Sequence, residues 1–358
     1  MGWETLLSSF AAVGLSGALA VPALRRKAFG DVRQDWLNDE LEIDRVDSDS
    51  ATIHNKCGAL TRVWKIQGTS YDSKLDEEQK ALHLARSAAL SGLCKKADLA
   101  LRLIVVKRRR PLSVAGAWPV ETLAEIGRAE EKQYRSSHRI DWYLMATGRS
   151  MQALIDADLL LKSRLGVFKP ELLKSSPPGE GACELTGFLN GLVCGEFSDV
   201  LPARSHSISG SLPAADLQFD KSGTVRTEGS EKAVQKIIAI REWPEAVSGQ
   251  LIAALLAIEG DLEIDHLIEP WARDRALLMW KRQQRQEKSN ILFPNRALSD
   301  EIDYVLEKLS DGTVCLLVSQ FQIVARAPNE TELDRLVDKV REVLGDRRVV
   351  ASVETVGA

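Results

Sequence analysis

The sequence has no closely spaced cysteines and none of the short motifs of common catalytic sites. Its five cysteines form no CxxC pair, so neither a disulfide framework nor a zinc site is indicated. A phosphate-binding loop of the GxxxxGK[ST] type needs a Gly-Lys pair, and the chain contains none. HExxH and GxSxG are also absent. We therefore expect no ATP hydrolysis by this chain alone, and we assign no catalytic, cofactor-binding or metal-binding residue.

The chain also lacks a strong excess of charge. Its 358 residues include 51 acidic and 47 basic side chains, which gives a net charge of −4. This balance argues against binding of nucleic acid over a large surface. With 44% hydrophobic and 27% charged residues, the composition excludes a disordered chain and fits a globular protein of two or three domains.

One long uncharged run lies at the N-terminus. Residues 5–24 carry no charge, Glu4 precedes them, and three basic residues follow: Arg25, Arg26 and Lys27. Twenty residues could span a bilayer, but the serines, glycines and proline in the run also allow a helix on the membrane surface or against a partner. We predict a hydrophobic membrane-associating helix over residues 1–27, and both arrangements remain open. If it spans, the basic residues place the rest of the chain in the cytoplasm.

Strand and helix patterns alternate after this run, which predicts an α+β fold. We expect two mixed α/β regions of ferredoxin-like type, over residues 50–175 and 182–358, joined by a helical and loop-rich segment. Strands are predicted at 51–57, 59–67, 99–107, 140–147, 234–242, 261–269, 314–325 and 348–353. Helices are predicted after a Ser73 cap, near 120–135, and at 150–174, 248–258, 271–290, 298–309 and from Asn329 to Gly345.

The predicted strand 261–269 carries a candidate histidine and two acids. Leu262, Ile264 and His266 alternate onto one side, which favours a hydrogen-bonded core histidine over a catalytic base. Glu263 and Asp265 alternate onto the other side and are expected to face solvent. An enzyme that uses His266 with these carboxylates is a weaker alternative.

Basic residues gather at two further places, Lys107–Arg110 at a strand end and Lys281–Lys288 on a helix that also carries Trp271 and Trp280. Solvated surface is the simplest interpretation of both groups. A contact with a protein partner or with anionic lipid is the functional alternative. The candidate contact residues are Arg25, Arg26, Lys27, Arg108, Arg109, Arg110, Lys281, Arg282 and Arg285.

From about residue 59 onwards, the order of these elements resembles the CagE/TrbE/VirB family, the ATPases of type IV secretion and conjugation. The resemblance is carried by the segments 63–68, 188–192, 237–244, 249–251, 281–284 and 300–344. No single segment is specific, and their order carries the resemblance. Members of the family usually continue into a motor domain with Walker motifs. We therefore expect ATP and Mg²⁺ to belong only to such a separate domain.

The resemblance implies a non-motor N-terminal and central part of a secretion ATPase. Such a part would dock the energising subunit to the inner-membrane translocation or pilus-assembly complex, in conjugal DNA or protein transfer. It implies other type IV secretion subunits as partners, a homo-oligomer, and a location at the cytoplasmic face of the bacterial inner membrane. Nucleic acid is not expected as a direct ligand. The alternative is a freestanding membrane-tethered module whose basic helix binds nucleic acid.

Overall fold

The computed structural model describes residues 41–47, 49–69, 74–96, 99–110, 118–133, 137–176, 183–197, 208, 212–229, 232–245, 247, 249–289, 296–311 and 316–355. Apart from Leu41, these residues belong to one compact unit, Glu42–Ala358. The predicted N-terminal helix, the Ser73 cap, Arg25, Arg26 and Lys27 lie outside the described residues. None of the helices that the structure does describe is long and apolar enough to cross a membrane.

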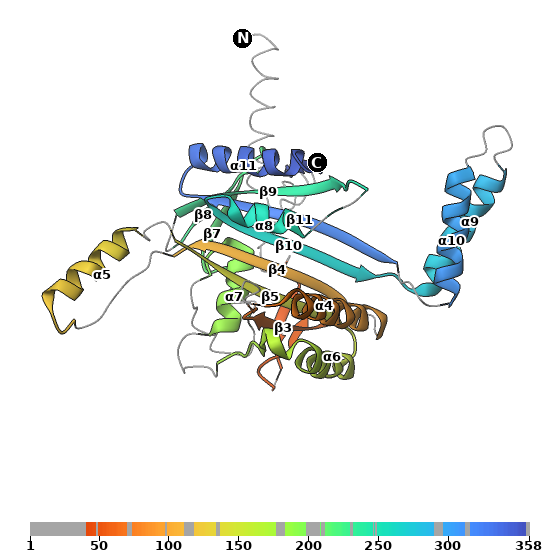
Figure 1. Ribbon diagram of the computed structural model, residues 1–358, viewed down its shortest axis with the longest axis horizontal. Helices are drawn as coiled ribbons and strands as arrows, with labels where there is room; N and C mark the ends of the chain where they lie inside the picture. The colour runs from red at the N-terminus through yellow and green to blue at the C-terminus, as the bar shows by residue number, and fades with distance from the viewer. Residues whose placement is uncertain are drawn as a thin grey trace, which may run out of the picture. The chain divides into compact units, whose positions relative to one another are not determined.

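The first half of the unit combines short and long strands with three helices (Figure 1). The strands are β1 (Ile43–Val46), β2 (Ile53–Asn55), β3 (Leu60–Ile66), β4 (Ala100–Arg109), β5 (His138–Gly148) and β6 (Pro170–Leu172). The helices are α4 (Asp76–Lys96), α5 (Glu121–Gln133) and α6 (Met151–Arg164), and a single 3₁₀ turn, η1 (Gly166–Phe168), follows α6. The helix predicted at 150–174 is therefore too long, because its last part is a turn and an edge strand.

The second half follows the same alternation. Its strands are β7 (Asp216–Phe219), β8 (Val225–Glu228), β9 (Lys232–Glu242), β10 (Asp261–Pro270), β11 (Leu317–Ala327) and β12 (Val350–Val353). Its helices are α7 (Glu184–Cys194), α8 (Gln250–Ala257), α9 (Arg273–Ser289), α10 (Arg296–Asp311) and α11 (Glu330–Gly345). The Asn329 cap is confirmed, because its side chain accepts the Glu332 N–H at 2.9 Å.

All twelve strands belong to one antiparallel sheet in the order β1-β2-β3-β5-β4-β10-β11-β9-β8-β7, with β6 on β3 and β12 on β9. The α+β class is confirmed, and the two halves of the chain contribute strands to the same sheet. Strand β4 of the first half pairs with β10 of the second from Leu101↔Ile268 to Lys107↔Leu262. The hydrogen bonds of this long pair join both halves into one sheet.

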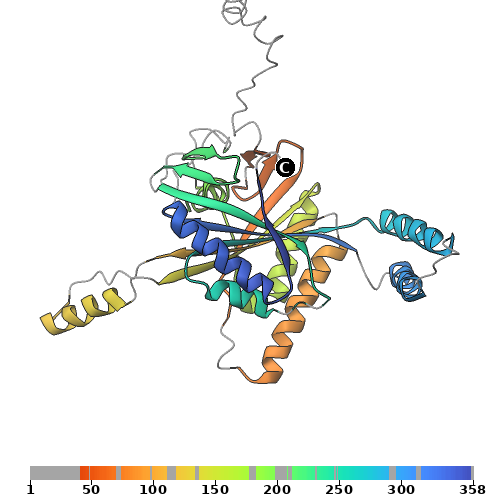
Figure 2. The same cartoon turned by 90° about the horizontal axis from the view of Figure 1, so that it is seen from above.

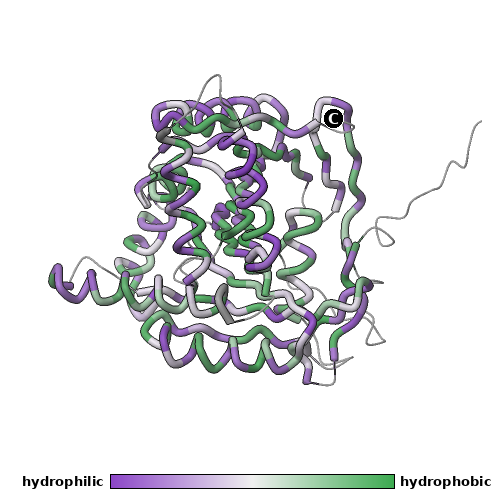
Figure 3. The backbone as a smooth tube through the Cα atoms, turned by 90° about the vertical axis from the view of Figure 1, so that its right-hand side faces the viewer, coloured by the Kyte–Doolittle hydropathy of each residue, from purple (hydrophilic) through white to green (hydrophobic). Residues whose placement is uncertain are grey.

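One face of the sheet is apolar and covered by helices (Figure 2). Side chains alternate between the faces along a strand, so Leu262, Ile264 and Ile268 of β10 share a face. Leu262 and Ile264 pack in a core with α8 and α11, whereas Ile268 packs against the core formed by α4 and α6. Hydrophobic and hydrophilic residues alternate along the helices, as expected for elements buried on one side (Figure 3).

The opposite face carries charged side chains on its central strands. Strand register places Asp141 and Tyr143 of β5, Arg102 and Arg108 of β4, Glu263 and Asp265 of β10 and Arg326 of β11 on this face. Helix α7 packs here, since Phe188 lies 4.3 Å from Tyr143 between ring centroids and Glu184 pairs with Lys65 at 2.7 Å. A polar layer therefore lies between α7 and the sheet.

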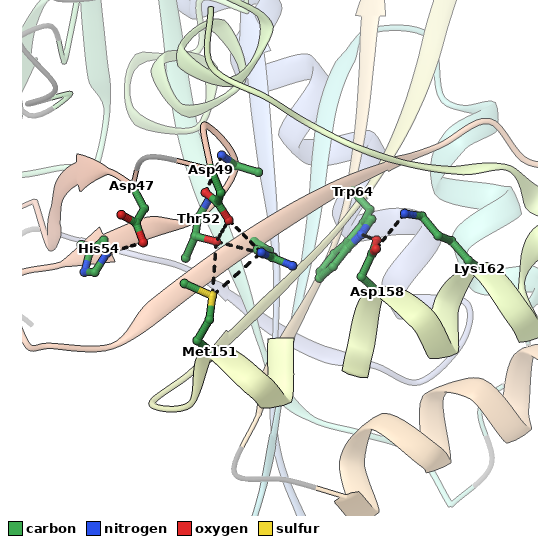
Figure 4. A network of polar contacts seen from close by, with 10 residues as sticks. Asp47, Asp49, Thr52, His54, Trp64, Met151, Asp158 and Lys162 are labelled. Carbon is green, nitrogen blue, oxygen red and sulfur yellow. Dashed lines mark hydrogen bonds and ion pairs between the residues drawn. The ribbon is translucent and has the colours of Figure 1, made fainter. Parts of the chain in front are cut away.

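A polar network ties the turn before β2 to β3 and to the start of α6 (Figure 4). Asp49 accepts hydrogen bonds from the Thr52 hydroxyl at 2.6 Å and from Arg62 Nη2 at 2.7 Å. The sulfur of Met151 lies 3.8 Å from the Thr52 hydroxyl. Burial raises the pKa of Asp49, but hydrogen bonds from Thr52, Ala51 and Arg62 outweigh it and lower the pKa to about 2.

This lowered pKa predicts a pH-dependent contribution to stability. A carboxyl whose pKa is lower in the folded state than its ordinary value stabilises the fold above that ordinary value and loses the effect as pH falls. Because Asp49 is one-third exposed, we expect Asp49→Asn to lower the free energy of unfolding by about 1 kcal/mol at pH 6 and by roughly half of that at pH 3. Urea unfolding at both pH values measures this. A difference that stays constant with pH would contradict the prediction, and Asp44→Asn, in an exposed pair, is the control.

Candidate basic cavity

The charged face of the sheet contains an open cavity of about 730 Å³. Basic side chains outnumber acidic ones in its lining. The lining residues are Lys65, Arg108, Arg109, Arg110, Arg139, Asp141, Tyr143, Glu184, Phe188, Gly195, Glu196, Phe197, Lys232, Ala233, Asp261, Arg326, Ala327 and Pro328. They come from β3, the ends of β4 and β11, the starts of β5, β9 and β10, and α7 with the residues after it. We call this the basic cavity.

Phe197 lines the basic cavity and contacts two of its arginines. The guanidinium carbon of Arg108 lies 4.5 Å from the centroid of its ring, and that of Arg326 lies 5.5 Å away. Such cation–π contacts hold an arginine without neutralising its charge. The ring lies directly over Gly191 of α7, where a Cβ atom would come within 2.1 Å of it. Glycine at this position therefore makes room for Phe197.

Gly195 lets α7 end close to Arg326. It has a φ of +86°, the left-handed conformation that glycine adopts readily at a helix C-terminus. A Cβ atom here would lie 2.7 Å from Nε of Arg326. The same residue therefore terminates the helix and allows the arginine side chain to approach.

Arg326 is buried and partly satisfied. Its Nη2 donates to Glu263 at 2.6 Å and its Nε donates to Gln235 at 3.0 Å. Its Nη1 is also buried, and no described residue accepts a hydrogen bond from it. Buried N–H groups are almost always hydrogen-bonded in folded proteins. This nitrogen is therefore an unused donor on a side chain that lines the basic cavity.

Arg108 is the second incompletely satisfied group. Burial lowers the pKa of the Arg108 guanidinium. The nearby Tyr143 and Asp141 act in the opposite direction, and the positive charges of Arg326 and Arg139 lower this pKa further. No carboxylate of a described residue forms an ion pair with it. Arg108 therefore lies half-buried among like charges, an environment that a bound anion would improve.

All four acidic residues of the lining, Glu196 included, already have interaction partners. Asp141 pairs with Arg139 at 2.9 Å, and Glu184 pairs with Lys65 at 2.7 Å. Asp261 accepts the backbone N–H of Arg109 at 2.6 Å. Burial raises the pKa of the Tyr143 hydroxyl to about 12, so it is a hydrogen-bond donor at neutral pH. The free groups of the cavity are thus mostly cationic or donors.

The structure separates the two predicted basic groups. Arg108, Arg109 and Arg110 line the basic cavity beside Asp261, which starts β10, whereas α9 begins just after β10 ends at Pro270. Ten strand residues, roughly 30 Å, lie between these places. Lys281, Arg282 and Arg285 of α9 are exposed. Helix α9 packs against α10, which carries an excess of Asp and Glu, so the acidic neighbour reduces the positive field of the basic helix.

Sequence reasoning missed Arg326, Phe197 and Lys65 as cavity residues. One signal in the sequence could have indicated Arg326, which directly follows the apolar strand predicted at 314–325. A charged residue that continues a buried strand needs a partner. Phe197 gives no such signal, since its place depends on the fold around α7.

The alternation of β10 is as predicted, but the expected exposure of its acids is wrong. His266 bonds Ser319 at 2.9 Å and packs on Phe321, as expected for a hydrogen-bonded histidine of the fold. Glu263 and Asp265 are buried, with 3% and 2% of their surface exposed, because Arg326 and Arg102 pair with them on the same face. Among the described residues, no group of three or more His, Cys, Asp or Glu could hold a metal ion.

A sequence model described as CagE, TrbE, VirB family, component of type IV transporter system, matches residues 171–358, more than half of the chain. The match covers the second half of the sheet, α7 and the α9–α10 pair. No curated protein matches the sequence.

Proposed function

Because the chain belongs to the CagE, TrbE, VirB family, a component of the type IV transporter system, we propose that it docks the energising subunit of such a system to its inner-membrane complex. The family match over residues 171–358 is the observation that carries this proposal. In this role the chain supplies binding surfaces, and ATP with Mg²⁺ belongs to a separate motor domain. Its partners are other type IV secretion subunits and further copies of itself, at the cytoplasmic face of the bacterial inner membrane.

The α9–α10 pair is a suitable docking element. It lies in the chain between the end of β10 and the start of β11, and it extends away from the helices that cover the sheet (Figures 1 and 2). Its exposed apolar side chains include Leu278, Met279 and Tyr304, which are 66%, 37% and 61% exposed. Leu317 and Val318 at the start of β11 are also exposed. Apolar groups beside the charges of Lys281, Arg282 and Arg285 are typical of a protein interface with a polar rim.

Co-purification tests this role. A tagged full-length chain is purified from bacterial inner membranes that contain its transporter system, and the recovered subunits are quantified by mass spectrometry. We expect Leu278→Asp to reduce their recovery at least fivefold, because a carboxylate at the centre of an apolar contact must be desolvated. Leu159→Asp, at the similarly exposed Leu159 of α6 (61%), is the matched control and should retain them. Full recovery with Leu278→Asp, or equal loss with both variants, would contradict the docking surface.

The N-terminal basic residues Arg25, Arg26 and Lys27 complete the proposal as contacts with anionic lipid headgroups. Each basic side chain near an anionic membrane contributes about 1 kcal/mol of attraction. Membrane fractionation of a chain without residues 1–27 tests this part separately from the α9–α10 contact. Unchanged membrane association would exclude these residues as the anchor.

A further inference from the structure

Two arginines of the basic cavity have hydrogen-bonding capacity that the described protein does not use. Arg326 is buried, and no described residue accepts a hydrogen bond from its Nη1, which is unfavourable for a buried donor. Arg108 contacts the face of Phe197 and has no carboxylate partner among the described residues. Both guanidinium groups contact the same ring, and both arginines line the basic cavity.

The surplus charge of the cavity is positive. Seven basic and four acidic side chains line it. Asp141 and Glu184 pair with Arg139 and Lys65, and the remaining cations, Arg108, Arg110 and Lys232 among them, supply the excess. Such clustering of cations in a recess attracts anions and concentrates them there.

The shape and the donors favour phosphate as the anion. Guanidinium groups bind phosphate oxygens with two parallel hydrogen bonds, and two guanidiniums match a diphosphate better than a single carboxylate. A volume of about 730 Å³ lies within the range of small-molecule sites and exceeds the size of one phosphate ion. Tyr143 and Phe188 offer an aromatic surface with a hydroxyl donor for an organic part.

We propose that the basic cavity binds a small organic phosphate, with its phosphate groups on Arg108 and on Nη1 of Arg326 and its organic part against Tyr143 and Phe188. This site is separate from the α9–α10 docking surface. Binding here can be measured on the chain alone, so its failure would leave the docking role untouched. Failure of docking would likewise leave this site untouched.

Calorimetric titration of the full chain with inorganic pyrophosphate and, separately, with ADP at 150 mM NaCl tests the proposal. We expect both to bind, and ADP to bind at least threefold more tightly because its base adds aromatic contact. Arg108→Gln should weaken both at least tenfold. Arg285→Gln, the same change on exposed α9, should alter them less than twofold. Tyr143→Phe should weaken ADP about threefold through loss of the hydroxyl donor.

Each other result would overturn a stated part of the proposal. If neither compound gives a heat of binding up to 1 mM, the site is excluded. A Kd of 1 mM corresponds to a binding free energy of roughly −4 kcal/mol. Equal weakening by Arg108→Gln and Arg285→Gln would mean attraction by overall charge rather than a site. Equal affinity for pyrophosphate and ADP would overturn the placement of the organic part. Because Arg108 forms no ion pair with a described residue, we expect Arg108→Gln to fold. Far-UV circular dichroism and the melting temperature check this.

Discussion

Glu263→Gln is expected to lower the free energy of unfolding by about 3 kcal/mol, and by up to about 5 kcal/mol if the site does not relax. Glu263 and Arg326 pair at 2.6 Å with side chains only 4% and 8% exposed. Burial raises the pKa of Glu263, and the charge of Arg326 opposes that rise. Removing the carboxylate charge leaves Arg326 buried without a counter-charge, beside its unused Nη1 donor.

Guanidinium-induced unfolding of the wild-type protein and of the Glu263→Gln variant measures this effect. Glu354→Gln is the matched control, because Glu354 pairs with Arg241 through the same kinds of atoms at the same 2.6 Å but on the surface. Exposed pairs contribute about 0–1 kcal/mol, so the control should change little. A loss below 1 kcal/mol for Glu263→Gln would show that the buried pair adds no more than the exposed one.

Trp64→Ala is expected to lower the free energy of unfolding by about 3–5 kcal/mol. Trp64 of β3 is fully buried in the core between the sheet and the helices α4 and α6. Its Nε1 donates to Asp158 at 2.8 Å, and Asp158 pairs with Lys162 at 2.7 Å (Figure 4). The substitution therefore removes a large apolar group and one partner of a half-buried carboxylate.

A second substitution separates the two contributions. Trp64→Phe keeps most of the apolar volume and loses the N–H donor, so we expect about 1–2 kcal/mol. Trp142→Ala, at a tryptophan that is 38% exposed on β5, should cost less than either. Unfolding is followed by far-UV circular dichroism, because fluorescence changes with tryptophan content. Equal stabilities of Trp64→Ala and Trp142→Ala would contradict the position of Trp64 in the core.

Local patterns predicted most elements of this fold. The apolar alternation of β10, the β-branched centre of β4 and the Asn329 cap each depend on neighbouring residues only, and all three appear where expected. Helix α7 was missed because its cap is Cys183, whose sulfur accepts the Thr186 N–H at 3.3 Å. Gly187 and Gly191 also weaken its helical pattern, although Gly191 is needed beneath Phe197.

Features that depend on distant residues could not be predicted in this way. The pairing of β4 with β10 and the burial of Glu263 both require strands that are far apart in the sequence. Of the residues that line the basic cavity, the sequence indicated only Arg108, Arg109 and Arg110, at the cationic end of β4. The concave shape depends on α7 and β11, which pack there only in the folded protein. The boundaries predicted for the two regions stay predictions, as do the lipid and partner contacts of the basic residues.

The β4–β10 pair also governs the order in which the chain can fold during synthesis. Arg102 pairs opposite Leu267, so the ribosome must add the intervening residues before β4 gains this neighbour. At about 5–20 residues per second, that interval lasts on the order of 10–30 s. During it β4 is an unprotected edge strand rich in β-branched residues, which can pair with other chains. Chaperone binding to the nascent chain is therefore expected to concentrate on β4 and to end once β10 emerges.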